Sequence, residues 1–349
     1  MSFARGTSFE KIAFLLLIFY VSPARADQIP DVDPNSKSPS KDQVLWTQTN
    51  VGYDLESEYN YVGGAPVNFG NGRAGDIEEQ YTDIRNIFTD RELMAILFHA
   101  GFDWERLGFE HADNTLPVPN QLNSLSTFLA ADFRWSSANM VRIQVEPGFY
   151  SDMTQFNGND VNIPIALAYT RVASQDFQWT LALSINDWRE NRFLPGGGFR
   201  YSINDQWKLK FMLPKPQIEY KANDWVHTWL GADFRGDSYR VASNFGDVRG
   251  LPTLNNALVD YQEVRVGSGF SWNIKPLLEL NAEAGWMVER SMNYHTSNIR
   301  MSSDTGAPYV GINIRVLFQL SKDLRPVKDQ IDEMQYQFPG LLRFFKVPQ

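Results

Sequence analysis

Apolar and polar residues alternate strictly along many segments between about Val51 and Phe318, and no segment there shows a helical period. Residues 177–185 are a clear example. Their apolar positions are Phe177, Trp179, Leu181, Leu183 and Ile185, and the positions between them are Gln178, Thr180, Ala182 and Ser184. A period of two is the pattern of β-strands with one apolar and one polar face. The sequence therefore predicts an all-β fold.

The hydropathy of the chain limits which classes of membrane protein it can belong to. The mean hydropathy is −0.35 and charged residues make up 21% of the chain. These values exclude a bundle of transmembrane helices. They do not exclude a transmembrane β-barrel, because only every second side chain of such a barrel contacts lipid.

The connections between the alternating segments differ in length in a regular way. Short turns are expected at 136–138, 173–176, 204–205, 223–224 and 273–276, and long loops at 112–123, 151–162, 244–258 and 291–307. A soluble β-sandwich mixes its connection lengths, whereas outer-membrane barrels have short turns on one rim and long loops on the other. The pattern favours an up-and-down antiparallel transmembrane β-barrel of about 12–14 strands over residues 50–318.

Tryptophans recur near the short turns. They are Trp135, Trp179, Trp207, Trp225 and Trp272. An amphipathic ring is most stable where lipid meets water, so this placement favours an aromatic girdle at one rim. The alternative is that these are ordinary core tryptophans.

The N-terminus has the pattern of a signal peptide. Arg5 and Lys11 precede an apolar run at 12–21, and Ala24 and Ala26 occupy the two small-residue positions of a cleavage site. The run is shorter than the roughly 20 residues of a membrane-spanning helix. We therefore predict removal of residues 1–26; a short N-terminal anchor is the alternative. Residues 27–49, rich in Pro, Ser and Asp, are predicted to be a disordered lead segment.

The last predicted strand ends at an aromatic residue. Val310, Ile312, Ile314 and Val316 occupy every second position before Phe318. This spacing resembles the C-terminal signature that the barrel assembly machinery recognises, although more residues follow here. Those residues, 319–349, are predicted to form a short helix-prone tail with a modest amphipathic stripe. We predict this periplasmic tail to lie outside the barrel, either free in the periplasm or against the lower rim.

No motif points to catalysis, a metal or a cofactor. The chain has no cysteine and only four histidines, and these are not paired at metal-ligand spacing. Nucleophile-elbow and phosphate-loop motifs are absent from the sequence as well. The net charge of −9 makes nucleic acid an unsuitable partner, because phosphate binding needs a basic surface. We expect no catalytic, cofactor or metal residues.

Charged residues on the polar strand faces are the candidate functional residues. A basic side chain facing lipid at mid-membrane costs about 2–4 kcal/mol, so these charges are expected to point into the lumen. The principal lumen charges are Arg134, Arg142, Glu146, Glu263, Arg265, Glu279, Glu283 and Arg315. The same alternation places Asp132, Arg200, Lys208, Lys210, Glu219, Lys221 and Glu289 inside with them.

The predicted inward charges are nearly balanced, eight basic against seven acidic. This balance favours ion pairs that brace the barrel from inside, and the alternative is a charged conduit for a polar solute. Pro214 and Pro216 break any spanning strand at 211–220. Side chains fill the interior of eight-stranded barrels, whereas porins with 16–18 strands hold an aqueous channel. A barrel of about 12–14 strands lies between these sizes, so a narrow or largely occluded lumen is expected.

Several phrases of the sequence together resemble a known family. They are LNSLSTFLAADFRW, VEPGFYSD, LPGGGFRYSINDQWKLKFMLPKPQIEY, GADFRGDSYRV and GAPYVGINIRVLF. In this order they resemble the bacterial outer-membrane barrels classified as domain of unknown function 6268, over roughly residues 50–318. The resemblance implies a barrel in the outer membrane, and it implies no reaction or ligand.

These observations lead to three functional hypotheses for an outer-membrane barrel that contacts lipid and is inserted by the barrel assembly machinery. The first is passage of small polar solutes through a narrow polar lumen. The second is a structural or surface-interaction role carried by the long loops. The third is an outer-membrane hydrolase.

Overall fold

The computed structural model describes residues 52–70, 72–89, 96–112, 116–136, 138–155, 157–275, 278–303 and 305–319. Within these ranges, no helix is long and apolar enough to cross a membrane. The predicted signal peptide with its cleavage residues Ala24 and Ala26, and the lead segment, lie outside the described residues. So does the predicted tail, apart from Gln319, which ends the last strand.

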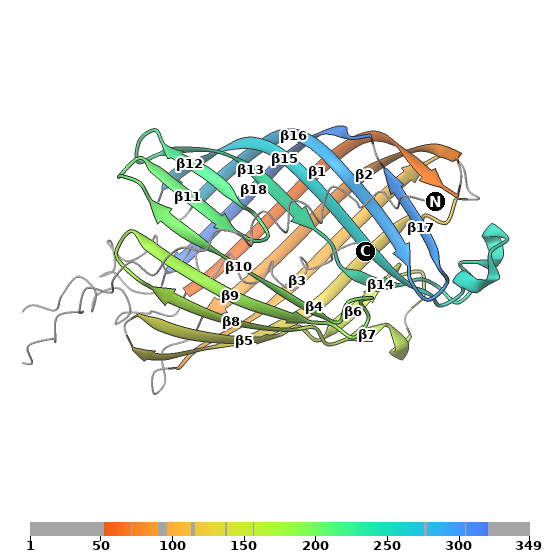
Figure 1. Ribbon diagram of the computed structural model, residues 1–349, viewed down its shortest axis with the longest axis horizontal. Helices are drawn as coiled ribbons and strands as arrows, with labels where there is room; N and C mark the ends of the chain where they lie inside the picture. The colour runs from red at the N-terminus through yellow and green to blue at the C-terminus, as the bar shows by residue number, and fades with distance from the viewer. Residues whose placement is uncertain are drawn as a thin grey trace, which may run out of the picture.

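The described residues form a closed antiparallel β-barrel of fourteen strands (Figure 1). The long strands are β1 (Gly52–Phe69), β2 (Gly72–Thr89), β3 (Ile96–His111), β4 (Gln121–Ser136), β15 (Leu258–Lys275) and β16 (Leu278–Tyr294). The single shorter strands are β9 (Phe177–Ile185), β10 (Phe193–Ser202), β11 (Trp207–Met212) and β12 (Gln217–Lys221).

Each remaining strand of the barrel consists of two consecutive segments. The pairs are β5 (Asn139–Val145) with β6 (Gly148–Ser151), β7 (Val161–Asn162) with β8 (Ile165–Val172), β13 (Val226–Arg235) with β14 (Ser238–Arg240), and β17 (Ile299–Ser303) with β18 (Ala307–Gln319). β1 pairs with both β2 and β18, which closes the ring. The predicted up-and-down topology of 12–14 strands is confirmed.

Side chains alternate between the two faces of the wall as predicted. On β9, the Leu181 side chain is 61% exposed on the outer face, whereas Thr180 is 2% exposed inside. The tryptophans support an outer girdle in part: Trp207 and Trp272 are exposed on the outside, next to short turns, whereas the exposed Trp225 lines the cavity inside the barrel. The side chain of Trp135 lies outside the described residues.

The two rims of the barrel differ. We call the rim where β1 begins and β18 ends the terminal rim, and the opposite one the loop rim. The connections from β3 to β4, from β6 to β7 and from β14 to β15 lie at the loop rim, and their described parts include residues 116–120, 157–160 and 241–257. The predicted long loop at 291–307 is wrong, because Tyr294 pairs with Ile299 and β16 and β17 nearly meet there. Inward residues Met292, Tyr294 and Met301 explain the extension, since their side chains join an apolar core inside the rim.

The proline-containing segment forms a short hairpin in the wall. β11 and β12 have six and five residues, so their turn at 213–216 lies below the loop rim. The carbonyl oxygens of Pro214 and Pro216 accept hydrogen bonds from the backbone N–H groups of Phe234 and Ala232, at 3.3 and 3.0 Å. Proline has no N–H, so the turn leaves fewer backbone donors to satisfy inside the wall.

Candidate functional site

The lumen has three levels. Below the loop rim lies an apolar core, which we call the cap; below the cap lies a layer of ion pairs, which we call the cross-lumen network; between the network and the terminal rim lies a cavity, which we call the vestibule. The cap is built from wall residues and from the loops at 116–120 and 241–257.

The cap consists of apolar side chains that fill the lumen. Its buried members include Leu116, Val118, Phe245, Leu254 and Tyr294, all less than 5% exposed. Such close packing of apolar side chains excludes water from the space that they fill. The cap therefore seals the loop-rim end of the lumen in this structure.

One arginine ties the loops of the cap together. Arg249 donates hydrogen bonds to the carbonyl oxygens of Leu116 and Val118 at 2.9 and 3.0 Å, and to that of Phe245 at 3.0 Å. Its guanidinium also lies 3.9 Å from the centre of the Phe245 ring. Partial burial lowers the pKa of Arg249, but an arginine stays charged, so all these bonds are charge-assisted.

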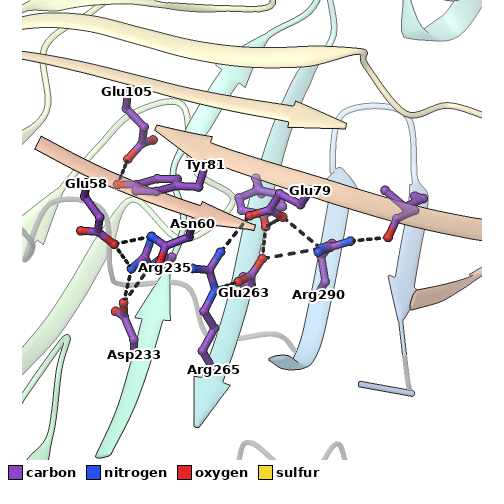
Figure 2. A network of polar contacts seen from close by, with 12 residues as sticks. Glu58, Asn60, Glu79, Tyr81, Glu105, Asp233, Arg235, Glu263, Arg265 and Arg290 are labelled. Atoms are coloured by element: carbon purple, nitrogen blue, oxygen red, sulfur yellow. Dashed lines mark hydrogen bonds and ion pairs between the residues drawn. The ribbon is translucent and has the colours of Figure 1, made fainter. Parts of the chain in front are cut away.

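The cross-lumen network joins β13, β15 and β16 to β1 and β2, which lie three or four places further round the ring. Arginines on β13, β15 and β16 reach across to carboxylates on β1 and β2 (Figure 2). Arg235 bonds Glu58, Arg265 contacts Glu79 at 3.0 Å, and Arg290 contacts the same Glu79 at 3.1 Å. These bonds link strands that are not neighbours in the wall. Tyr239 on β14 also donates a hydrogen bond to Glu105 on β3, nearly opposite in the ring, so the network closes the lumen at a second level.

Buried hydrogen bonds complete the network. Glu263 bonds Arg265 and lies 3.6 Å from Arg290, and Tyr261 donates to Glu263 at 2.5 Å. All of these side chains are 2% exposed or less. A buried charge is tolerated only when it is paired and hydrogen-bonded. Each arginine here is paired with a carboxylate, and Nη1 of Arg265 and Nη2 of Arg290 have no hydrogen-bond partner among the described residues. The ion pairs stiffen this layer.

The vestibule is a polar cavity of about 1470 Å³. It reaches the turns of the terminal rim at Asp176, Asp205 and Asp224, and it ends where Arg235 meets Glu58. Charged side chains from β1, β2, β10, β11, β12, β16 and β18 line it. The lumen is therefore open to the terminal rim and closed above.

The structure gathers some of the predicted lumen charges and separates others. Glu263 and Arg265 lie together in the network. Glu279 and Arg315 lie in the vestibule, 3.6 Å apart, and Glu283 lies there 3.9 Å from Arg235.

Arg142 on β5 and Glu146, directly after that strand, point inward and lie away from those groups. Arg142 bonds both oxygens of Asp132 at 2.6 and 2.7 Å and lies 3.2 Å from His99. Glu146 accepts a hydrogen bond from Gln144 at 2.6 Å. The backbone of Arg134 belongs to β4, and its side chain lies outside the described residues.

One inward prediction is wrong. A bulge in β16 shifts the register, so that Arg265 pairs with Met287 but Val264 pairs with Glu289. Val264 belongs to the outward set of β15, and Glu289 therefore follows it outward. Arg290 takes the inward position instead, opposite Glu263. The extra residue of a bulge reverses the parity of every later position.

Sequence reasoning missed most of the acids of the lumen. They are Asp54, Glu56, Glu58, Glu79, Asp83, Asp103 and Glu105, on β1 to β3. Each is at a period-two position, so extending the alternation to residues 54–60, 79–85 and 103–105 would have found them. With these acids included, the lumen is not balanced, because acidic groups outnumber basic ones among the vestibule residues.

Metal and catalytic chemistry have little support in this part of the chain. Among the described residues, no cluster of three or more His, Asp or Glu side chains could hold a metal ion. His99 and Asp132 are buried and 3.0 Å apart, and their contact with Arg142 occupies both groups. The hydrolase hypothesis stays untested.

The fold and the lumen define the class: a β-barrel of the outer-membrane type whose polar lumen is closed at two levels. More specifically, the chain belongs to the family described as domain of unknown function 6268, whose model matches residues 124–321, more than half of the chain. The resemblance seen in the sequence is thereby confirmed. No curated protein matched the sequence.

Solved structures of similar fold include transport proteins. The Pseudomonas putida toluene transporter TodX is 8% identical with a TM-score of 0.40, over 80% of this chain and 92% of TodX. A Pseudomonas aeruginosa FadL homologue is 10% identical with a TM-score of 0.35, over 78% of this chain and 91% of the homologue. The outer-membrane channel DcaP of Acinetobacter baumannii is 11% identical with a TM-score of 0.34, over 77% of this chain and 96% of DcaP.

Proposed function

We propose that this chain is an outer-membrane channel for small polar solutes, and that the structure is its closed state. The apolar outer face contacts outer-membrane lipid, the terminal rim faces the periplasm and the loop rim faces outward. One observation carries the proposal: a charged cavity of about 1470 Å³ leads from the terminal rim to the cross-lumen network. A barrel that served only as a brace would have no need of this solvated volume.

The cap is the gate in this proposal. Its loops at 116–120 and 241–257 are not strands of the wall, so they can move while the barrel stays closed against lipid. Arg249 holds both loops through backbone carbonyls, and Tyr294 donates to the carbonyl of Pro117 at 2.7 Å. Loss of the Arg249 bonds would free the loops without cutting any strand pairing.

Conductance recording tests the gate. We expect the purified parent in planar bilayers to show small, infrequent openings, and Arg249→Gln to open at least about tenfold more often, because several charge-assisted bonds are lost. Arg192→Gln is the matched control, since the Arg192 side chain is 64% exposed and its contact with Asp187 is 3.8 Å. Equal, ion-impermeable behaviour of the parent and Arg249→Gln would refute the channel.

A second candidate function is a braced barrel that acts through its loops. The observation that favours it is that Arg235, Arg265 and Arg290 each pair with a carboxylate of another strand inside the lumen. Silence of all three proteins in bilayers, with intact barrels, would support this candidate over the channel.

Export and assembly are part of the proposal. Envelope protein should begin at Asp27, as N-terminal sequencing would show; a retained Met1 would contradict cleavage after Ala26. The barrel should fractionate with outer membranes and migrate differently on detergent gels before and after boiling, because a closed barrel has no free edge. Insertion by the barrel assembly machinery predicts that depletion of that machinery lowers the folded fraction.

A further inference from the structure

We propose that the vestibule binds small dipolar solutes, which carry an ammonium group at one end and a carboxylate at the other. The solute would lie between an acidic wall on β1 and β2 and a basic wall on β10 and β11. This inference rests on the proposed function and names the solute class for the same lumen.

The acidic wall places carboxylates directly beside one another. In the strand register, Glu58 on β1 is opposite Asp83 on β2, and Asp83 is opposite Glu105 on β3. Glu56 lies two residues from Glu58, and Glu56, Glu58 and Asp83 all line the vestibule. Like charges directly opposite each other destabilise a sheet. Such a row is not what bracing alone would select.

The acidic wall contains one basic residue, which does not change the sign of its net charge. Arg85 lines the vestibule opposite Glu56, and its guanidinium lies 3.0 Å from Asp103 and 3.6 Å from Asp83. Two carboxylates therefore already surround this cation. The wall remains acidic overall.

The basic wall has the complementary arrangement. Arg200 on β10 is directly opposite Lys210 on β11, and Lys208 lies two residues away on the same face. All three side chains line the vestibule. Glu219 on β12 bonds Lys210 at 2.6 Å. It is the acid that the strands β10, β11 and β12 themselves contribute to the vestibule lining; Asp176, Asp205 and Asp224 line it from the turns at the terminal rim. The strand part of this wall is therefore basic.

The two walls face each other across the ring. In the order of the fourteen strands, β10 is diametrically opposite β1, and β11 is opposite β2. The gap between the walls narrows toward the network, where Lys215 at the tip of the β11–β12 hairpin comes within 3.8 Å of Glu58. Below that contact, the walls enclose the vestibule.

Opposed walls of opposite sign create a transverse field. Low-dielectric walls focus such a field into the space between them. A dipolar solute that lies across the lumen has a favourable electrostatic interaction with both walls. A purely anionic or cationic solute is attracted by one wall and repelled by the other. Selection of dipolar over singly charged solutes follows.

Binding to the purified barrel tests this inference without any need for the channel to open. The probes are 6-aminohexanoate, hexanoate and hexylamine, measured by titration calorimetry or ligand-observed NMR at pH 7 and low salt. We expect 6-aminohexanoate to bind at least about fivefold more tightly than either singly charged analogue. Equal affinities, tighter binding of an analogue, or no binding of 6-aminohexanoate would each overturn the inference.

Two substitutions, one in each wall, sharpen the test. Lys208→Gln should remove the preference for 6-aminohexanoate over hexylamine, and Glu56→Gln should remove the preference over hexanoate. Neither residue belongs to the cross-lumen network, and Arg192→Gln is again the control. Gel migration before boiling verifies that each variant is folded. Unchanged preferences in both folded variants would refute the two-wall site, as would equal losses in the control.

Failure of this inference and failure of the proposed function are distinguishable. A barrel that binds 6-aminohexanoate but never conducts would contradict the channel and keep the site. A barrel that conducts but shows no dipolar preference would keep the channel and contradict the site.

Discussion

The acids of β1 and β2 meet two different environments along the lumen. At the height of the network, Glu79 is contacted by Arg265 and Arg290 and is fully buried. At the height of the vestibule, Glu56 lines a solvated cavity whose opposite wall carries Lys208. The first arrangement is a buried layer of ion pairs, and in the second the charged groups line a cavity.

This difference teaches that lumen charges in one barrel can serve two purposes. Contacting pairs in a dry layer give rigidity, because removal of one partner leaves an uncompensated buried charge. Charged groups that line a cavity act through their field on whatever enters it. Experiments that disturb one region should leave the other almost unchanged.

The largest effect is expected in the network. Arg265→Ala should leave Glu79 and Glu263 adjacent and short of a cation, which destabilises the barrel by about 3–5 kcal/mol. The measurement is the temperature at which the compact form is lost on detergent gels.

The matched control for that substitution is Arg300→Ala, an exposed residue of β17. Its transition should stay within about 0.5 kcal/mol of the parent. A variant Arg265→Ala as stable as this control would show that the network does not brace the barrel.

The next largest effect is expected from salt, which should affect the vestibule and the network differently. Raising NaCl from low concentration to 0.5 M should weaken 6-aminohexanoate binding to the vestibule about tenfold, because solvated charges are screened over a few ångströms. The unfolding temperature of the parent should change little, since the network is buried. Loss of stability in parallel with loss of binding would contradict the distinction between the two environments.

The smallest effect is expected where vestibule acids are secondary partners. Glu279 lies 3.6 Å from Arg315, which is closer to Asp54 at 3.0 Å. Glu283 is 3.9 Å from Arg235, which already bonds Glu58. The double variant Glu279→Gln/Glu283→Gln should therefore lose less than about 1 kcal/mol. A loss of several kcal/mol in thermal unfolding would place these acids within the brace.

The wall could be predicted from the sequence because period-two alternation is a local property. The pattern of 177–185 and the break at Pro214 and Pro216 both appear in the structure as expected. The approximate strand number followed from counting such segments. This reasoning works well for membrane barrels, because a charged side chain that faces lipid destabilises the barrel.

Contacts across the lumen could not be predicted, because they depend on ring closure. Nothing in the sequence indicates that Arg235 and Glu58, 177 residues apart, will bond. The reach of Lys215 depends on where a short hairpin ends within the wall. Glu289 points outward because of a bulge in β16, and no local residue pattern indicates that bulge.

That bulge has a consequence for how the gene can change. β16 contains one residue more than β15 between the pairs Arg265–Met287 and Val264–Glu289, and the additional residue is Val288. Deleting its codon would give an uninterrupted ladder and would still direct Arg290 inward. A substitution that forced the unshortened strand straight would instead present Glu289 to Glu263. For this strand, we therefore expect deletion of Val288 to be tolerated in evolution better than a substitution that removes the bulge and keeps the strand length.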